Sequence, residues 1–203
     1  MAAMPMFPLG TVLLPGVVLP LHVFEPRYQQ LVRDCLDAPE HEFGVVLIDR
    51  GSEVGGDDSR LAVGVVATML QVAAMDGDRF AVVTLGTRRI RVIQWLPDDP
   101  YPRAEVEDWP DEVGETPRNR LEATAARARS CAGLAVEMGD RSGVPEVELT
   151  GDPSADTFLL AAICPFGPDD QYAALSAPDP STRLDLIDRM LDDVEAALRF
   201  RLG

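Results

Sequence analysis

The 203-residue sequence predicts an α+β protein, in which a β-rich first half is followed by a helical second half. Two observations support this fold class. Short apolar runs separated by turn residues fill the first 110 residues, a pattern typical of a small barrel or sandwich. After that point the apolar residues recur at spacings of three and four, and prolines and capping residues precede the runs.

The chain opens with an apolar, proline-rich stretch, PMFPLGTVLLPGVVLPLHVFEPRY, at residues 5–28. A proline inside a helix costs about 3 kcal/mol, so Pro8, Pro15 and Pro20 exclude a membrane-spanning helix. A secretory signal also needs a basic start, and no Arg or Lys precedes Arg27. We therefore expect two strands over residues 4–9 and 17–23, with a turn at residues 14–16 and prolines at strand ends, edges or bulges.

The rest of the first half predicts one helix and several strands. A helix is expected over residues 26–36, because five residues fall on one of its faces. These residues are Tyr28, Leu31, Val32, Cys35 and Leu36. Strands are expected over residues 43–48, 61–75, 80–85, 89–92 and 103–107. Residues 76–78 form the turn of a hairpin, and Gly86 separates two of the strands.

The second half predicts a helical bundle. Helices are expected over residues 121–138, with a stop at Gly139, and over residues 155–163 and 168–175. Thr182 and Asp185 resemble a capping box that starts the final helix. The apolar stripe of that helix is interpreted as bundle core and consists of Leu184, Ile187, Leu191, Val194 and Leu198. The change of pattern divides the chain into a β subdomain, 1–112, and a helical subdomain, 113–203.

The charge and the residue types exclude several classes of function. Thirty-four acidic residues oppose eighteen basic ones, giving a net charge of −16, which disfavours binding to nucleic acid. All the basic residues are Arg, and without Lys the chain has no P-loop, Ser-Lys dyad or Schiff-base lysine. The three cysteines form no C-x-x-C pair, and Cys35 and Cys164 are expected in the core. This usage predicts a reducing, cytoplasmic location.

No catalytic motif or metal-ligand pattern is present, so we expect neither an enzyme nor a cofactor. His22 lies in an apolar strand and is expected to be packed, whereas His41 is expected in an exposed turn. The spacing of Cys35 and His41 leaves a Cys–His pair open, although Cys35 falls on the apolar face of its helix. Paired acids such as Glu105/Glu107 and Asp192/Asp193 are typical of solvated faces. Glu105 and Glu107 share one strand face and could bind a hard cation weakly, but a full site needs six or more oxygens from several elements.

Four blocks of the sequence, in order, resemble the N-terminal substrate-binding domain of the ATP-dependent Lon protease. They are FPLGTVLLPGVVLPLHVFEPRYQQLVRDCL, LAVGVVATMLQV, FAVVTLGTRRIRV and PYPRAEVE. The second half, including the DP-x-x-Arg-Leu run at residues 179–184, is similar to the closing helices of that family. Lon proteases continue into ATPase and Ser-Lys protease modules, for which this chain has no lysine. We therefore expect a free-standing Lon N-domain protein.

The resemblance implies a PUA-like β-barrel of about six strands plus one helix, followed by a helical bundle. It also implies a non-catalytic protein-binding module that recognises unfolded or apolar peptide segments, or an adaptor in protein quality control. Its partners would be client proteins, and a separate ATP-dependent protease is a further candidate; no membrane partner is expected, and no oligomeric state follows.

The candidate peptide-binding residues lie mostly in the opening stretch. They are Leu14, Pro15, Val18, Phe24 and Tyr28, with Arg27 and Arg89 as polar contacts. The alternative is that Val18, Phe24 and Tyr28 belong to the core, and that Gly86 and Arg89 are a bulge and its structural ion pair.

A second hypothesis is RNA binding, because some PUA-like barrels bind RNA. The only basic cluster is Arg88, Arg89 and Arg91, and strand alternation would place Arg89 and Arg91 on one face. The net charge opposes this hypothesis. A third is an enzyme that uses Cys35 or the acidic residues.

Overall fold

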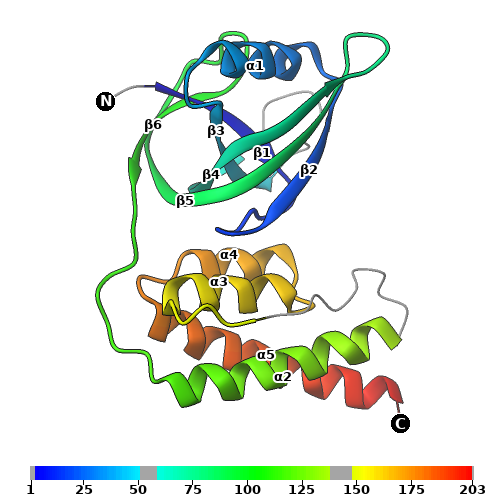
Figure 1. Cartoon of the computed structure of the whole chain (residues 1–203), viewed down its shortest axis with the longest axis vertical. Coiled ribbons are helices and arrows are strands. Elements are labelled where there is room, and N and C mark those ends of the chain that lie inside the picture. Colours follow the sequence, from blue (N-terminus) through cyan, green and yellow to red (C-terminus); the bar gives the residue numbers. More distant parts are fainter. Residues whose placement is uncertain (1–2, 51–58, 138–147, 203) are drawn as a thin grey trace. The chain divides into compact units, whose positions relative to one another are not determined.

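The computed structural model describes residues 3–50, 59–137 and 148–202. The chain forms two compact units, Met1–Pro110 and Asp111–Gly203 (Figure 1). The first is called the β unit and the second the helical unit.

The β unit is a mixed six-stranded sheet with one helix. Its elements are β1 (Ala3–Leu9), β2 (Val18–Val23), α1 (Pro26–Asp37), β3 (Glu42–Arg50), β4 (Ser59–Ala74), β5 (Phe80–Leu96) and β6 (Arg103–Asp108). The strand order is β2-β5-β4-β3-β1-β6, and β6 also pairs with β5. β1 and β3 are parallel, whereas the other pairs are antiparallel. Five strands therefore pair in a closed cycle. β2 is not part of this cycle and pairs with β5 as an additional strand.

The core of the β unit is built by apolar residues from the five strands of the cycle. Met6, Val46, Val66, Ile90 and Ala104 form one buried cluster, with one residue from each strand. Burial of such side chains contributes about 1.5–3 kcal/mol each for the larger ones.

The helix α1 lies across one end of the sheet (Figure 1). It buries Tyr28, Leu31, Val32 and Cys35, as predicted from their spacing. Leu36 was predicted on the same face, but it is exposed. At 3.6 residues per turn, Leu36 is rotated by about 80° from Tyr28, which places it at the margin of the stripe.

The strand β5 is continuous, whereas the sequence predicted two strands separated at Gly86. A Cβ atom at this position would lie 2.4 Å from the carbonyl oxygen of Leu14. Gly86 therefore allows a close approach of the preceding loop and does not end the strand. The register between β4 and β5 shifts next to it, so the predicted bulge is confirmed.

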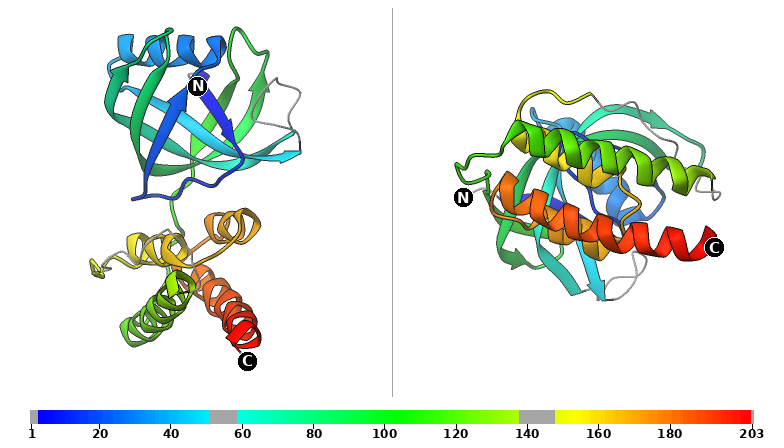
Figure 2. Two further views of the ribbon diagram at one scale, coloured as in Figure 1. Left: turned by 90° about the vertical axis from the view of Figure 1, so that its right-hand side faces the viewer. Right: turned by 90° about the horizontal axis from the view of Figure 1, so that it is seen from below.

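The helical unit contains α2 (Arg118–Glu137), α3 (Pro153–Ile163), α4 (Pro168–Leu175) and α5 (Pro180–Leu202). α2 and α5 lie alongside each other and run in the same direction (Figure 2). Leu184, Ile187 and Leu191 of the predicted stripe are buried, and Val194 is half-buried. The side chain of Leu198 and the predicted stop at Gly139 lie outside the described residues.

The helix α5 begins three residues earlier than predicted, because its cap is at position 179 and not at 182. Its cap is Asp179, whose carboxylate accepts hydrogen bonds from the Thr182 amide (2.9 Å) and hydroxyl (2.7 Å). Pro180 occupies the first position of the helix, where its missing N–H costs no hydrogen bond. The predicted capping role of Thr182 is therefore wrong, because Thr182 donates to the cap.

The described cysteines are all buried and free, which confirms the core positions of Cys35 and Cys164. Within the part of the chain that the structure describes, no helix combines the length and apolar character needed to cross a bilayer.

Candidate functional site

The strand β2 pairs with β5 along one side only, and the described residues place no strand on its other side. The amide of Gly86 donates to the carbonyl of Val17 (2.9 Å). This hydrogen bond shows which backbone groups face β5: those of Val17 and of every second residue after it. Because backbone groups alternate along an antiparallel strand, those of Val18, Pro20 and His22 point to the open side. Pro20 lacks an N–H, and on this side the loss costs no hydrogen bond in the sheet.

The side chains along β2 alternate between the core and solvent. Val18, Pro20 and His22 are exposed, and β2 carries no Asp, Glu or Arg. His22 was expected to be packed in the strand, but it shares a face with Val18 and points to solvent. The prediction for His22 is therefore wrong, since its position in the strand's alternation outweighs its apolar neighbours in sequence.

A pocket of about 160 Å³ lies beside the end of β2. Its lining comprises Phe7 and Leu9 of β1, residues 20–23 of β2, Phe24 and Glu25 just before α1, and Tyr28 in the first turn of α1. In the left view of Figure 2, β1 and β2 are neighbours next to α1. The open side of β2 and this pocket together are called the β2 site.

The aromatic lining of the pocket is held by stacked rings. The ring of Phe7 stacks on that of Tyr28, with centroids 4.1 Å apart. The guanidinium of Arg27 lies 4.5 Å from the Tyr28 centroid and pairs with Glu25 at 3.1 Å. Phe24 remains 55% exposed at the edge of the pocket. The pocket therefore combines a fixed apolar wall with one exposed aromatic side chain.

Four of the seven predicted peptide-binding residues lie at or beside the β2 site. Phe24 and Tyr28 line the pocket, Arg27 contacts Tyr28, and Val18 lies on β2 with 53% of its surface exposed. Tyr28 is buried, so only part of its ring contributes to the pocket wall. The exposure of Val18 and Phe24 contradicts the alternative that these two belong to the core.

The other three predicted residues lie elsewhere. Pro15 is half-buried in the turn before β2, and Leu14 is buried against Gly86. Arg89 is also buried; its Nε donates to the carbonyl of Trp109 (2.9 Å), and its guanidinium lies 4.1 Å from the centroid of that ring. Leu14 and Arg89 therefore offer no surface to a peptide.

The sequence reasoning missed most of the pocket lining. The missed residues are Phe7, Leu9, Pro20, Leu21, His22, Val23 and Glu25. A signal existed for β2, because a proline within a strand marks an open edge. For Phe7 and Leu9 there was none, since their proximity to β2 depends on the order of strands in the sheet.

The pair Cys35–His41 does not form a catalytic dyad. The Cys35 thiol donates to the carbonyl of Glu42 (3.3 Å), and His41 Nδ1 contacts the Cys35 carbonyl at 3.0 Å. Burial and the nearby Asp34 raise the pKa of Cys35 to about 12. A protonated thiol is a poor nucleophile, so this cysteine is structural.

The acidic and basic clusters were considered above as sites for a metal ion or for RNA, and the described residues support neither role. Among the described residues, no group of three or more His, Cys, Asp or Glu could hold a metal ion. Arg88 pairs with Glu42 (2.7 Å) and Asp108 (3.0 Å). Arg89 and Arg91 lie on one face, as predicted, and both contact the Trp109 ring. Arg88 and Arg89 are thus committed to internal contacts, which weighs against phosphate binding.

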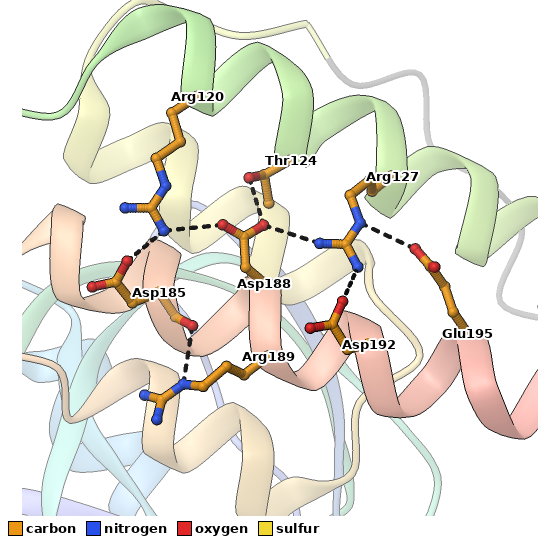
Figure 3. Close-up of polar contacts among 8 residues, drawn as sticks. All are labelled: Arg120, Thr124, Arg127, Asp185, Asp188, Arg189, Asp192 and Glu195. Atoms are coloured by element: carbon orange, nitrogen blue, oxygen red, sulfur yellow. Dashed lines mark hydrogen bonds and ion pairs between the residues drawn. The ribbon is translucent and has the colours of Figure 1, made fainter.

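A polar network joins α2 to α5 in the helical unit (Figure 3). Arg120 of α2 pairs with Asp185 and Asp188, and Thr124 donates to Asp188 (2.8 Å). Further along the same helices, Arg127 pairs with Asp188, Asp192 (2.6 Å) and Glu195 (3.1 Å). These ion pairs and hydrogen bonds connect the two parallel helices, so we interpret the network as structural.

Comparison with known proteins gives a consistent result. The model of the ATP-dependent protease La (LON) substrate-binding domain matches residues 3–193. A Lon protease of Anaeromyxobacter dehalogenans is 28% identical over 205 residues, which cover 99% of this chain and 22% of that protein. Lon protease 2 of Myxococcus xanthus is 26% identical over 194 residues, covering 93% and 23%. The chain thus spans less than a quarter of these curated relatives.

Solved structures agree with the sequence relatives. A Lon N-terminal domain protein from Xanthomonas campestris aligns with a TM-score of 0.67 and 26% identity, covering 91% of this chain and 96% of that one. The N-terminal domain of a Mycobacterium avium complex Lon protease shares the fold, with a TM-score of 0.64, 22% identity, and coverage of 95% and 99%. That domain family is the non-catalytic part of a protease, because proteolysis resides in a separate domain. The chain therefore belongs to the family of Lon substrate-binding domains.

Proposed function

We propose that this chain binds unfolded or apolar segments of client proteins at the β2 site. The observation that carries the proposal is an open strand side next to an apolar pocket, in a member of a substrate-binding family. By the same reasoning the chain acts in protein quality control, presenting clients to an ATP-dependent protease. The curated relatives support this role, because they are Lon proteases.

The binding mode is addition of a client strand to β2. Val18 and His22 offer N–H groups on the open side, and the carbonyls of Val18, Pro20 and His22 offer acceptors. A folded protein has already paired most of its backbone groups, whereas an unfolded segment can form these hydrogen bonds. Strand addition therefore explains how one site could select unfolded chains of many sequences.

Three further proposals concern the fold class, the division of roles between the subdomains and the cellular setting. The closed pairing cycle of β5, β4, β3, β1 and β6 supports a PUA-like barrel in the β unit. We assign client binding to the β subdomain, residues 1–112 by the sequence pattern and Met1–Pro110 by the structure. The helical subdomain, residues 113–203 and Asp111–Gly203 respectively, has a supporting role. The free, buried cysteines support a reducing, cytoplasmic setting.

A comparison of one test protein in two states tests the function. A small disulfide-bonded protein is used natively and after reduction and carbamidomethylation, which keeps it unfolded without adding charge. Fluorescence anisotropy of the labelled protein is measured while the full chain is added. We expect the unfolded form alone to bind; equal binding of both forms, or of neither, would contradict the proposal.

The strand-addition mode has its own test with N-methylated peptides. An apolar peptide is synthesised with N-methyl groups at every second residue, in either of the two possible phases. One phase removes the N–H groups that would face β2, and the other removes those that face solvent. We expect only the first to lose affinity, whereas equal losses would exclude strand addition.

A further inference from the structure

We propose that the pocket of the β2 site is an anchor position that selects client segments. It takes a single bulky apolar side chain, such as a benzyl or isobutyl group, from a segment with basic rather than acidic neighbours. This inference rests on the proposed function and specifies its substrate class. It has two independent grounds, the dimensions of the pocket and the charge around it.

The first ground is size and lining. The pocket volume of about 160 Å³ is close to that of the roughly 150 Å³ apolar cavity known to bind benzene. One aromatic ring or branched aliphatic side chain therefore fills it. Phe7, Leu9, Val23, Phe24 and Tyr28 supply apolar walls. The Phe7–Tyr28 stack and the overlying Arg27 hold the wall in place, so little ordering is required on binding.

The second ground is charge complementarity. The only charged residue among the described lining is Glu25, which is paired with Arg27, and β2 itself carries no charge. The pocket therefore favours an uncharged anchor. The chain as a whole carries −16 and has no lysine. Its field repels acidic segments and attracts basic ones, and salt screens both effects.

The geometry also relates the anchor to the strand. The pocket is lined by residues 20–23 of β2, so it adjoins the strand to whose open side a client segment would be added. In strand-addition complexes, backbone hydrogen bonds give affinity and side-chain pockets give specificity. The β2 site contains both parts.

The experiment uses fluorescein-labelled peptides and the full chain. Each peptide places Phe, Leu, Ala or Asp between Ser and Thr residues, with flanks of either Lys or Glu. Replacing Phe by Ala should reduce the affinity at least about tenfold, and Leu should bind within a few-fold of Phe. Lys flanks should bind more tightly than Glu flanks at about 0.05 M salt, and the difference should shrink at about 1 M.

Two protein variants test whether the preference for the Phe peptide depends on the pocket. Phe24→Ala should reduce the preference for the Phe peptide over the Ala peptide. Ile93→Ala removes an apolar residue of the same unit with similar exposure (48% for Ile93, 55% for Phe24) and should leave that preference unchanged. Both positions are exposed, so neither variant should disturb folding.

The outcomes separate the inference from the proposed function. If Phe and Ala peptides bind equally, or if the flanks make no difference, the anchor inference is overturned while client binding stands. If neither the peptides nor the unfolded test protein binds, the proposed function itself fails.

Discussion

Arg183 is the largest fully buried side chain in the molecule's described part, with an exposure of 0%. Its guanidinium donates to both carboxylate oxygens of Asp111 (2.6 and 3.0 Å), to the Ala174 carbonyl (3.0 Å) and to the Thr157 hydroxyl (2.9 Å). It also lies 3.5 Å from the centroid of the Phe158 ring. A buried cation is tolerated only when it is fully paired in this way.

Removal of the Asp111 carboxylate should therefore destabilise the helical unit. Asp111→Ala leaves the Arg183 charge buried without its anion, and such losses cost about 3–5 kcal/mol. Glu112→Ala, at the exposed neighbouring position, should change the stability by less than about 0.5 kcal/mol. Denaturant unfolding followed by helical circular dichroism measures both. Similar stabilities of the two variants would show that the buried pair is dispensable.

Asp179 is a second residue whose ionisation affects the fold. Hydrogen bonds from Thr182 lower the pKa of its carboxyl below the usual value of 3.8. Because the folded pKa is depressed, the stabilisation is present above the unfolded pKa and is lost as the pH falls through the folded pKa. An N-cap carboxylate typically contributes about 1 kcal/mol.

Asp179→Ala should therefore cost about 1 kcal/mol at pH 7, and this difference from the parent should diminish below about pH 4. Asp179→Asn keeps a capping oxygen without a titrating charge. The difference in free energy of unfolding between the Asn and Ala variants should therefore not depend on pH. Unfolding curves at several pH values provide the measurement. If the stability difference between the parent and the Ala variant stayed constant at all pH values below about 4, the ionised cap would be contradicted.

At the scale of elements, α2 and α5 are joined by charges that follow the helical repeat. Arg120, Thr124 and Arg127 recur at spacings of four and three, and their acidic partners on α5 do the same. Paired acids such as Asp192 and Asp193 are expected from the sequence alone on a solvated face, yet Asp192 pairs with Arg127. The repeat was visible in the sequence, but the partner helix was not, because the pairing joins residues more than sixty positions apart.

Arg127→Ala should destabilise the helical unit by about 1 kcal/mol at low salt, and by less at about 1 M salt. Arg127 pairs with three acids, whereas Arg118 has 84% of its side chain exposed and pairs with Glu122 on its own helix. Arg118→Ala should therefore cost only about 0.3 kcal/mol. Thermal unfolding at two salt concentrations compares them, and equal costs without salt dependence would contradict a stabilising network.

Periodicity and proline placement predicted most elements to within a few residues. The face of α1 formed by Tyr28, Leu31, Val32 and Cys35 is an example, because a local repeat determines it. The break at Gly86 was wrong because the glycine accommodates Leu14, which is distant in sequence. The start of α5 was misplaced because Thr182 and Asp179 are both good caps, and the proline between them decides which one is used.

At the scale of the whole molecule, the sequence blocks predicted the family but only part of the site. Phe24 and Val18 were identified and are exposed, since the opening stretch is too apolar to be entirely core. Leu14 and Arg89 were predicted on the same grounds but are buried. Leu14 packs against Gly86 of β5, and Arg89 contacts Trp109. The role of Phe7 and Leu9 in the pocket follows from the strand order, which no local pattern encodes.

The central claim is that client segments bind at the β2 site. Amide NMR spectra of the full ¹⁵N-labelled chain, recorded as the Lys-flanked Phe peptide is added, test it most directly. The amides of Val18, His22 and Phe24 should shift, because two of them face the open side of β2 and the third lines the pocket. Saturable shifts confined to α2 and α5, with β2 unchanged, would contradict the claim.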